Sequence, residues 1–80
     1  MQKIKKFLKK INPIDRSRVN GYIERIMTGD IAGMDIQRLT DVKDTFRVRV
    51  GRVRIIFERI EGKVEILEVG WRNDNTYQGL

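Results

Sequence analysis

The chain has 80 residues, a formal charge of +6 and neither cysteine nor histidine. This length predicts one domain, residues 1–80, with a compact core, and the missing residue types exclude disulfide bonds, cysteine zinc sites and the usual histidine base. The charge favours an anionic partner, and because no apolar run follows the basic start, we expect a cytoplasmic location without a signal peptide or membrane span.

Two amphipathic helices are predicted at the start of the chain. Over residues 2–11, apolar residues recur at the i, i+3, i+4, i+7 spacing of one helix face, and these are Ile4, Phe7, Leu8 and Ile11. Residues 14–28 repeat the pattern, and Asn12-Pro13 supplies a cap and a proline at the first helical position. The short link between the helices predicts a helical hairpin.

The apolar period changes from helical to two after residue 45. Residues 29–44 are expected to form a polar connection anchored by Met34, Ile36 and Leu39. Gly51-Arg52 breaks the next run with glycine first, which suits a type II′ hairpin. Strands then follow over residues 53–60 and 63–69, with a second turn at 61–62. We therefore predict an α+β fold in which two helices pack on one face of a three- to four-stranded antiparallel sheet.

The predicted hairpin also fixes which residues face one another. Its register pairs Val50 with Val53, Arg49 with Arg54, Val48 with Ile55 and Phe46 with Phe57. Side chains alternate between the faces of a strand, so these apolar residues share the face beneath the helices. The opposite face then carries Arg47, Arg49 and Arg54.

Like charges on directly opposite strand residues are destabilising, so this arginine row is costly unless an anion lies over it. Arginine has a planar fork that matches phosphate oxygens. The row therefore indicates phosphate binding. The alternative is a solvated strand face that Glu58 and Glu65 neutralise.

Other basic and aromatic residues also allow two interpretations. Two interpretations of the N-terminal lysines, among them Lys6 and Lys10, come first. They form the solvent-exposed side of an amphipathic helix, or they extend a nucleic-acid binding surface. Binding to a membrane surface is the third-ranked interpretation. Trp71 and Tyr77 either cap the core edge or stack on a base. Tyr77 is also a candidate for proton transfer. Arg52, in the turn, and Arg59 are expected to stand outside the site.

Two segments resemble a known family when they are taken together. In order and spacing, "FRVRVGRVRIIFE" and "ILEVGWRNDNTY" resemble the RelE/ParE toxin superfamily, and most closely its RelE branch of ribosome-dependent messenger-RNA endonucleases. The resemblance covers roughly residues 3–77. It implies two helices on a twisted antiparallel sheet, and a type II toxin–antitoxin system in which the toxin enters the ribosomal A site and inhibits translation.

The resemblance also implies a site. Arg47 and Arg49 match two basic strand positions, Arg54 matches an arginine on the next strand, Arg72 matches the arginine of the "VGxR" segment, and Tyr77 matches a terminal tyrosine. These five are the candidate catalytic residues. The candidate RNA-binding residues are Lys6, Lys10, Lys43 and Trp71.

The implied reaction is metal-independent attack of the RNA 2′-hydroxyl on the adjacent phosphate, with no metal or other cofactor. The implied partners are messenger RNA, the ribosome and a cognate antitoxin, including a higher-order complex with that antitoxin, and no membrane. Arginines stabilise the charged transition state in this scheme.

Three departures from the family keep other functions open. The strand that usually precedes the first helix is expected to be missing, position 71 is tryptophan where relatives often have histidine, and positions 47 and 49 lack the lysine that is the usual candidate base. Arginine is a poor general base because its pKa exceeds about 12. The alternatives are a ParE-like gyrase inhibitor and an inactive relative that binds only RNA or an antitoxin.

Overall fold

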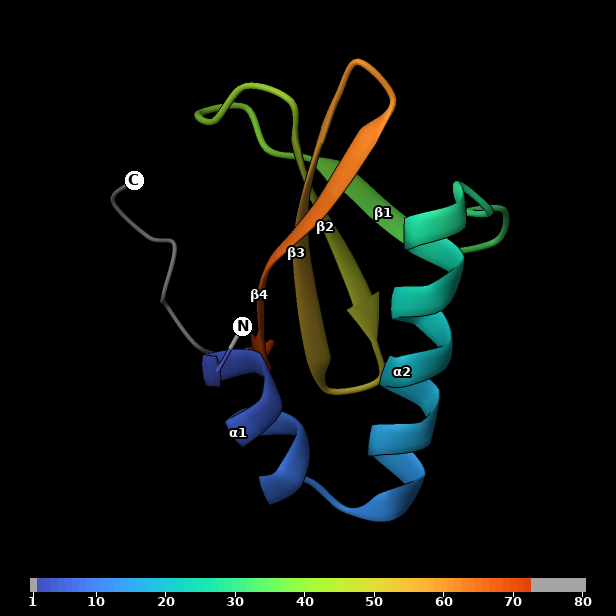
Figure 1. Ribbon diagram of the computed structural model, residues 1–80, viewed down its shortest axis with the longest axis vertical. Helices are drawn as coiled ribbons and strands as arrows, with labels where there is room; N and C mark the ends of the chain where they lie inside the picture. Colours follow the sequence, from blue (N-terminus) through green and yellow to red (C-terminus); the bar gives the residue numbers. More distant parts are fainter. Residues whose placement is uncertain (1, 73–80) are drawn as a thin grey trace.

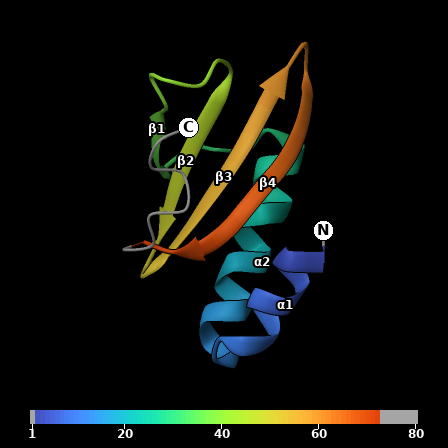
Figure 2. The ribbon, with the colours of Figure 1, turned by 90° about the vertical axis from the view of Figure 1, so that its left-hand side faces the viewer.

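The computed structural model describes residues 2–72. Two helices precede a sheet of four antiparallel strands, whose order in space is that of the sequence. The elements are α1 (Gln2–Lys10), α2 (Pro13–Thr28), β1 (Asp35–Arg38), β2 (Thr45–Val50), β3 (Val53–Ile60) and β4 (Lys63–Trp71). Both helices lie on one side of the sheet, and in the turned view the strands stand in front of them (Figure 1 and Figure 2). The predicted fold class is confirmed.

Local signals set the ends of α2. The side chain of Asn12 caps the first turn by accepting a hydrogen bond from the Asp15 amide at 2.8 Å, and Pro13 occupies the first turn. Gly29 ends the helix with a left-handed φ of 84°, which glycine adopts without a steric penalty. The predicted helical hairpin and its cap are therefore both present.

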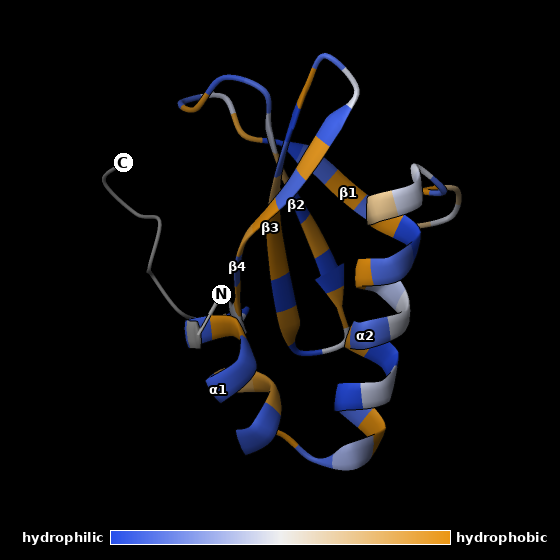
Figure 3. Ribbon diagram, viewed as in Figure 1, coloured by the Kyte–Doolittle hydropathy of each residue, from blue (hydrophilic) through white to orange (hydrophobic). Residues whose placement is uncertain are grey.

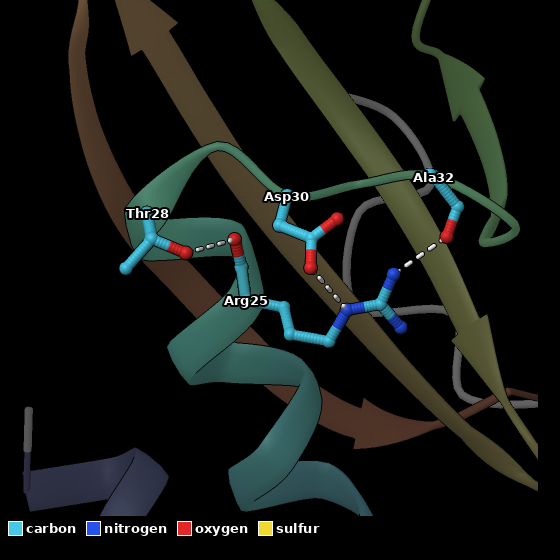
Figure 4. Close-up of polar contacts among 4 residues, drawn as sticks. All are labelled: Arg25, Thr28, Asp30 and Ala32. Carbon is cyan, nitrogen blue, oxygen red and sulfur yellow. Dashed lines mark hydrogen bonds and ion pairs between the residues drawn. The ribbon is translucent and has the colours of Figure 1, made fainter.

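A polar cluster ties the end of α2 to the segment that leads into β1 (Figure 4). Arg25 Nε lies 3.3 Å from Asp30 Oδ2, and its Nη2 donates to the carbonyl of Ala32. Thr28 Oγ1 donates to the Arg25 carbonyl at 3.0 Å. Because both partners of the ion pair are well exposed, its contribution to stability is small, but its geometry sets the direction in which the chain leaves the helix.

The strand register agrees with the predicted one at each pair that was specified. Val50 lies opposite Val53, and Arg49 lies opposite Arg54. Hydrophobic and hydrophilic residues alternate along most of β2 (Figure 3), whereas β3 contains three consecutive buried apolar residues, Ile55, Ile56 and Phe57. The apolar side chains of these strands form the core with α1 and α2, and its most buried members are Val19, Ile26, Val48, Val53 and Ile55.

The connection before β2 differs from the prediction. Residues 29–44 contain strand β1, which pairs with β2 through Asp35 opposite Arg49 and Gln37 opposite Arg47. The polar sequence DIQR hides this strand because three of its four residues are exposed and only the fourth, Ile36, packs against the core. Of the predicted anchors, Met34 is buried, whereas Ile36 and Leu39 are half-buried.

The sheet therefore has four strands without any strand ahead of α1 among residues 2–72. Within the same residues, no helix has the length and apolar character needed to cross a membrane. Strand β4 forms the edge opposite β1 and pairs with β3 along its length, with one register shift beside Ile56 and Phe57.

Candidate functional site

Arginines from separate strands meet at one pocket. The pocket has a volume of about 620 Å³ and lies at the end of the sheet that carries the β2–β3 turn. Arg47 and Arg49 come from β2, Arg54 comes from β3, and Arg72 directly follows β4. The lining is completed by Arg52 and Trp71. All four arginines proposed as catalytic are thus brought together.

The strand pattern explains why these arginines share a face. Arg49 and Arg54 are directly opposite each other, and alternation puts Arg47 on the same side of the sheet, away from the helices. Three half-buried guanidinium groups therefore lie together. An anion in the pocket would relieve their mutual repulsion, so the pocket is a candidate anion site.

Arg47 experiences this environment most strongly. Burial lowers the pKa of Arg47, the charge of Arg49 lowers it further, and Asp35 acts in the opposite direction. Since the ordinary arginine pKa is far above neutrality, the guanidinium stays charged. The lowered pKa means that the positive charge of Arg47 destabilises the folded chain. A phosphate oxygen bound at this guanidinium would offset that destabilisation.

Strand β1 orients the same guanidinium. Arg47 Nη2 donates a hydrogen bond to Gln37 Oε1, and Gln37 is the cross-strand neighbour of Arg47. Arg47 Nε is buried and donates to no acceptor within the part of the chain that the structure describes. Strand β1 thus holds one end of the guanidinium, and the Nε–H is shielded from solvent.

The turn between β2 and β3 is fixed by the end of β4. Gly51 has a φ of 58° and Arg52 has no positive φ, as the predicted type II′ turn requires. Arg72 donates twice to this turn, from its amide to the Arg52 carbonyl at 2.8 Å and from Nη1 to the Gly51 carbonyl at 3.0 Å. These bonds hold the turn and the strand end as one unit.

Trp71 lies between the helical layer and the pocket. Its ring makes an edge contact with Phe7 of α1, with centroids 5.1 Å apart and planes at 72°. The Arg52 guanidinium carbon lies over the same ring, 5.6 Å from its centroid. Trp71 therefore covers the core edge, which is one of the two roles predicted for it, and keeps 37% of its surface exposed beside the arginines. Stacking on a base stays a prediction.

The prediction that Arg52 stands outside the arginine group is wrong. Its position in a turn suggested a side chain pointing into solvent, but Trp71 attracts the guanidinium over its ring. Arg59 is exposed and does not line the pocket. Gln37 was not among the predicted site residues. The signal that would have indicated it is the alternation of polar and apolar residues in Asp35, Ile36 and Gln37.

The remaining predicted residues lie elsewhere. Lys6, Lys10 and Lys43 are exposed and do not line the pocket. Tyr77 lies outside the residues that the structure describes. The acids proposed to neutralise the arginine row, Glu58 and Glu65, face each other farther along the β3–β4 hairpin and line a separate hollow.

The pocket lining consists of guanidinium groups and one indole. Guanidinium groups bind phosphate oxygens through paired N–H donors and stabilise negative charge that develops on them. Among residues 2–72, no cluster of three carboxylates is placed to hold a metal ion. The chemistry that this lining supports is therefore the binding of a phosphate group beside a flat aromatic surface.

Comparison with known proteins gives one informative result. No family model matches the sequence, and no curated protein matches it. The fold is similar to that of a chain in the crystal structure of the RelB–RelE antitoxin–toxin complex from Methanococcus jannaschii, with a TM-score of 0.76. The sequences are 23% identical, and the match covers 90% of this chain and 87% of that chain.

Proposed function

We propose that this chain is the toxin of a type II toxin–antitoxin system and that it cleaves messenger RNA on the ribosome. The observation that carries the proposal is the convergence of Arg47, Arg49, Arg54 and Arg72 on one pocket. The likeness of the fold to a chain of an antitoxin–toxin complex supports it, as does the sequence resemblance to RelE toxins.

The proposed reaction needs charge stabilisation more than any other contribution. Attack of a 2′-hydroxyl on the adjacent phosphate forms a pentavalent group with additional negative charge. Positioned N–H donors that face this charge commonly supply the largest part of catalysis. Arg47 lines the pocket, and we assign its guanidinium to a non-bridging phosphate oxygen. Arg54 and Arg72 bind the same phosphate from the neighbouring strands.

We also propose an antitoxin as the regulatory partner. A solved structure with a similar fold is a chain in a complex of toxin and antitoxin. A strongly positive pocket offers an acidic segment of such a partner a surface that it can neutralise. The partner would thereby block RNA at the same arginines.

A second function deserves a test because of the pocket composition. The described lining contains neither a carboxylate nor a lysine, so none of these side chains is a good proton acceptor near neutral pH. A relative that binds RNA or its antitoxin without cleaving RNA would have such a lining. No feature of the described residues favours gyrase inhibition in the same way.

The test is ribosome-dependent cleavage by the purified chain, with cut sites mapped by primer extension. We expect cleavage by the parent chain and a loss of at least about a hundredfold in the Arg54→Ala, Arg72→Ala double variant, because each lost donor typically costs this much. Arg59→Ala is the matched control, since it removes an exposed arginine outside the pocket.

Each other outcome selects a different conclusion. Full cleavage by the double variant would contradict the assigned site. A parent chain that binds an antitoxin but cuts no RNA would support the inactive relative. DNA damage in cells without cut messenger RNA would indicate gyrase inhibition.

A further inference from the structure

Among residues 2–72, the exposed indole of Trp71 is the one aromatic group in the pocket lining. Phosphate binding alone has no use for an indole, because the ring offers a flat apolar face and a single N–H donor. A nucleic acid also presents flat faces, those of its unpaired bases. Bases in single-stranded RNA stack on aromatic rings and on guanidinium planes.

Trp71 and Arg52 supply both kinds of plane. The guanidinium carbon of Arg52 lies 5.6 Å from the centroid of the ring. Arg52 is exposed and projects from a turn, so its side chain can shift outward with little loss of packing. Its planar group can then cover a base that lies on the indole.

The indole and the backbone of the turn are fixed before any ligand arrives. Phe7 packs against the indole in a T-shaped arrangement, with ring centroids 5.1 Å apart, and thus limits rotation of the indole. The two hydrogen bonds from Arg72 hold the backbone of the turn beside the end of β4. A ring and a turn that are already ordered lose little entropy when they bind a base.

We infer that Trp71 and Arg52 form a nucleobase-stacking subsite next to the phosphate-binding arginines. This inference rests on the proposed function in one respect, namely that the arginine pocket binds RNA. In addition to that function, we infer that the pocket contacts the face of a base as well as a phosphate. Because Trp71 and Arg72 line the same pocket, the stacked base belongs to a nucleotide beside the phosphate that Arg72 contacts.

The chain contains a single tryptophan, so its fluorescence reports on this subsite alone. The probe is a short single-stranded RNA in which every 2′-hydroxyl is methylated, which blocks cleavage. Its partner probe has the same sugar–phosphate backbone without bases. We expect the first RNA to quench Trp71 and to bind about tenfold more tightly than the second, which corresponds to about 1.4 kcal/mol of stacking.

Variants of Arg52 separate stacking from charge. Arg52→Lys keeps the positive charge but removes the plane, so we expect weaker binding of the base-containing RNA and unchanged binding of the abasic probe. Arg59→Gln is compared with Arg52→Gln, because both remove one exposed arginine. Trp71→Leu should weaken binding of the base-containing RNA about tenfold. Because this change also removes the contact with Phe7, circular dichroism is used to check that the variant is folded.

The results distinguish this inference from the proposed function. RNA binding with unaltered Trp71 fluorescence, or equal affinity for the two probes, would overturn the stacking subsite even if ribosome-dependent cleavage is intact. Quenching with a tenfold preference for bases supports the subsite even if the chain cleaves nothing. Equal effects of Arg52→Lys on both probes would also overturn it.

Discussion

The two faces of the sheet consist of alternate residues from the same strands, but they are arranged for different purposes. Beneath the helices, Val48 and Ile55 are fully buried, and Phe46 stacks on Phe57 with ring centroids 5.3 Å apart. On the other face, Arg49 lies directly across from an arginine of the next strand. The buried apolar face lowers the free energy of the folded chain. The arginine face raises that free energy, and it also creates a positive electrostatic potential.

Removing a side chain from the helix-covered face should have the largest effect on stability. Ile55→Ala leaves a cavity at a fully buried position in β3, and such changes typically cost about 2–5 kcal/mol. Urea unfolding followed by circular dichroism measures the loss. Leu67→Ala is the control, because Leu67 is an apolar residue of the neighbouring strand with 36% of its surface exposed. Equal losses for both variants would contradict the assigned core.

The two hairpin turns provide the next comparison. Gly51 and Gly62 have φ values of 58° and 82°, so alanine at either position should cost about 1 kcal/mol. Only Gly51→Ala should also weaken RNA binding, because Gly51 belongs to the turn that Arg72 holds. Urea unfolding and fluorescence anisotropy with labelled RNA measure the two effects. Weaker RNA binding by Gly62→Ala would show that the pocket extends farther along the sheet.

The smallest effect concerns the arginine face and has the opposite sign. Arg49→Gln removes the like-charge pair with Arg54 and also the opposite charge across from Asp35. Because Asp35 is exposed, its attraction to Arg49 contributes little. The variant should therefore raise the free energy of unfolding by about 0.5 kcal/mol, or the melting temperature by about 3 °C. The same variant should lose RNA binding. Arg59→Gln should leave stability unchanged, because the cross-strand neighbour of Arg59 is Val64. A lower melting temperature for Arg49→Gln would mean that the arginine row stabilises the free chain.

The sequence was sufficient to predict the arginine face because two signals agreed. A period of two assigned alternate residues to opposite faces, and glycine at the first position of a two-residue turn fixed the register. Phe46 opposite Phe57 and Arg49 opposite Arg54 followed from these signals, and the structure has both pairs. Local rules were sufficient here because hairpin partners are close in the sequence.

Features that depend on distant contacts were missed. Strand β1 gains its pairing from β2, and its residues Asp35 and Gln37 look like part of a polar loop until that pairing is known. The position of Arg52 depends on Trp71, which is far along the chain but lies at the end of the neighbouring strand. Neither hydropathy nor turn type contains this information, because both describe neighbours in sequence.

The turn at Glu61-Gly62 has a practical consequence for work on this protein. A side chain placed at Gly62 would meet nothing within 4 Å, and both turn residues have positive φ values, as in a tight turn at a hairpin tip. Such tips accept inserted segments more readily than other parts of a domain. An affinity tag or fluorescent label inserted between these residues would lie at the end of the sheet opposite the arginine pocket. The pocket would then stay accessible, so the labelled protein could be used in single-molecule measurements on ribosomes.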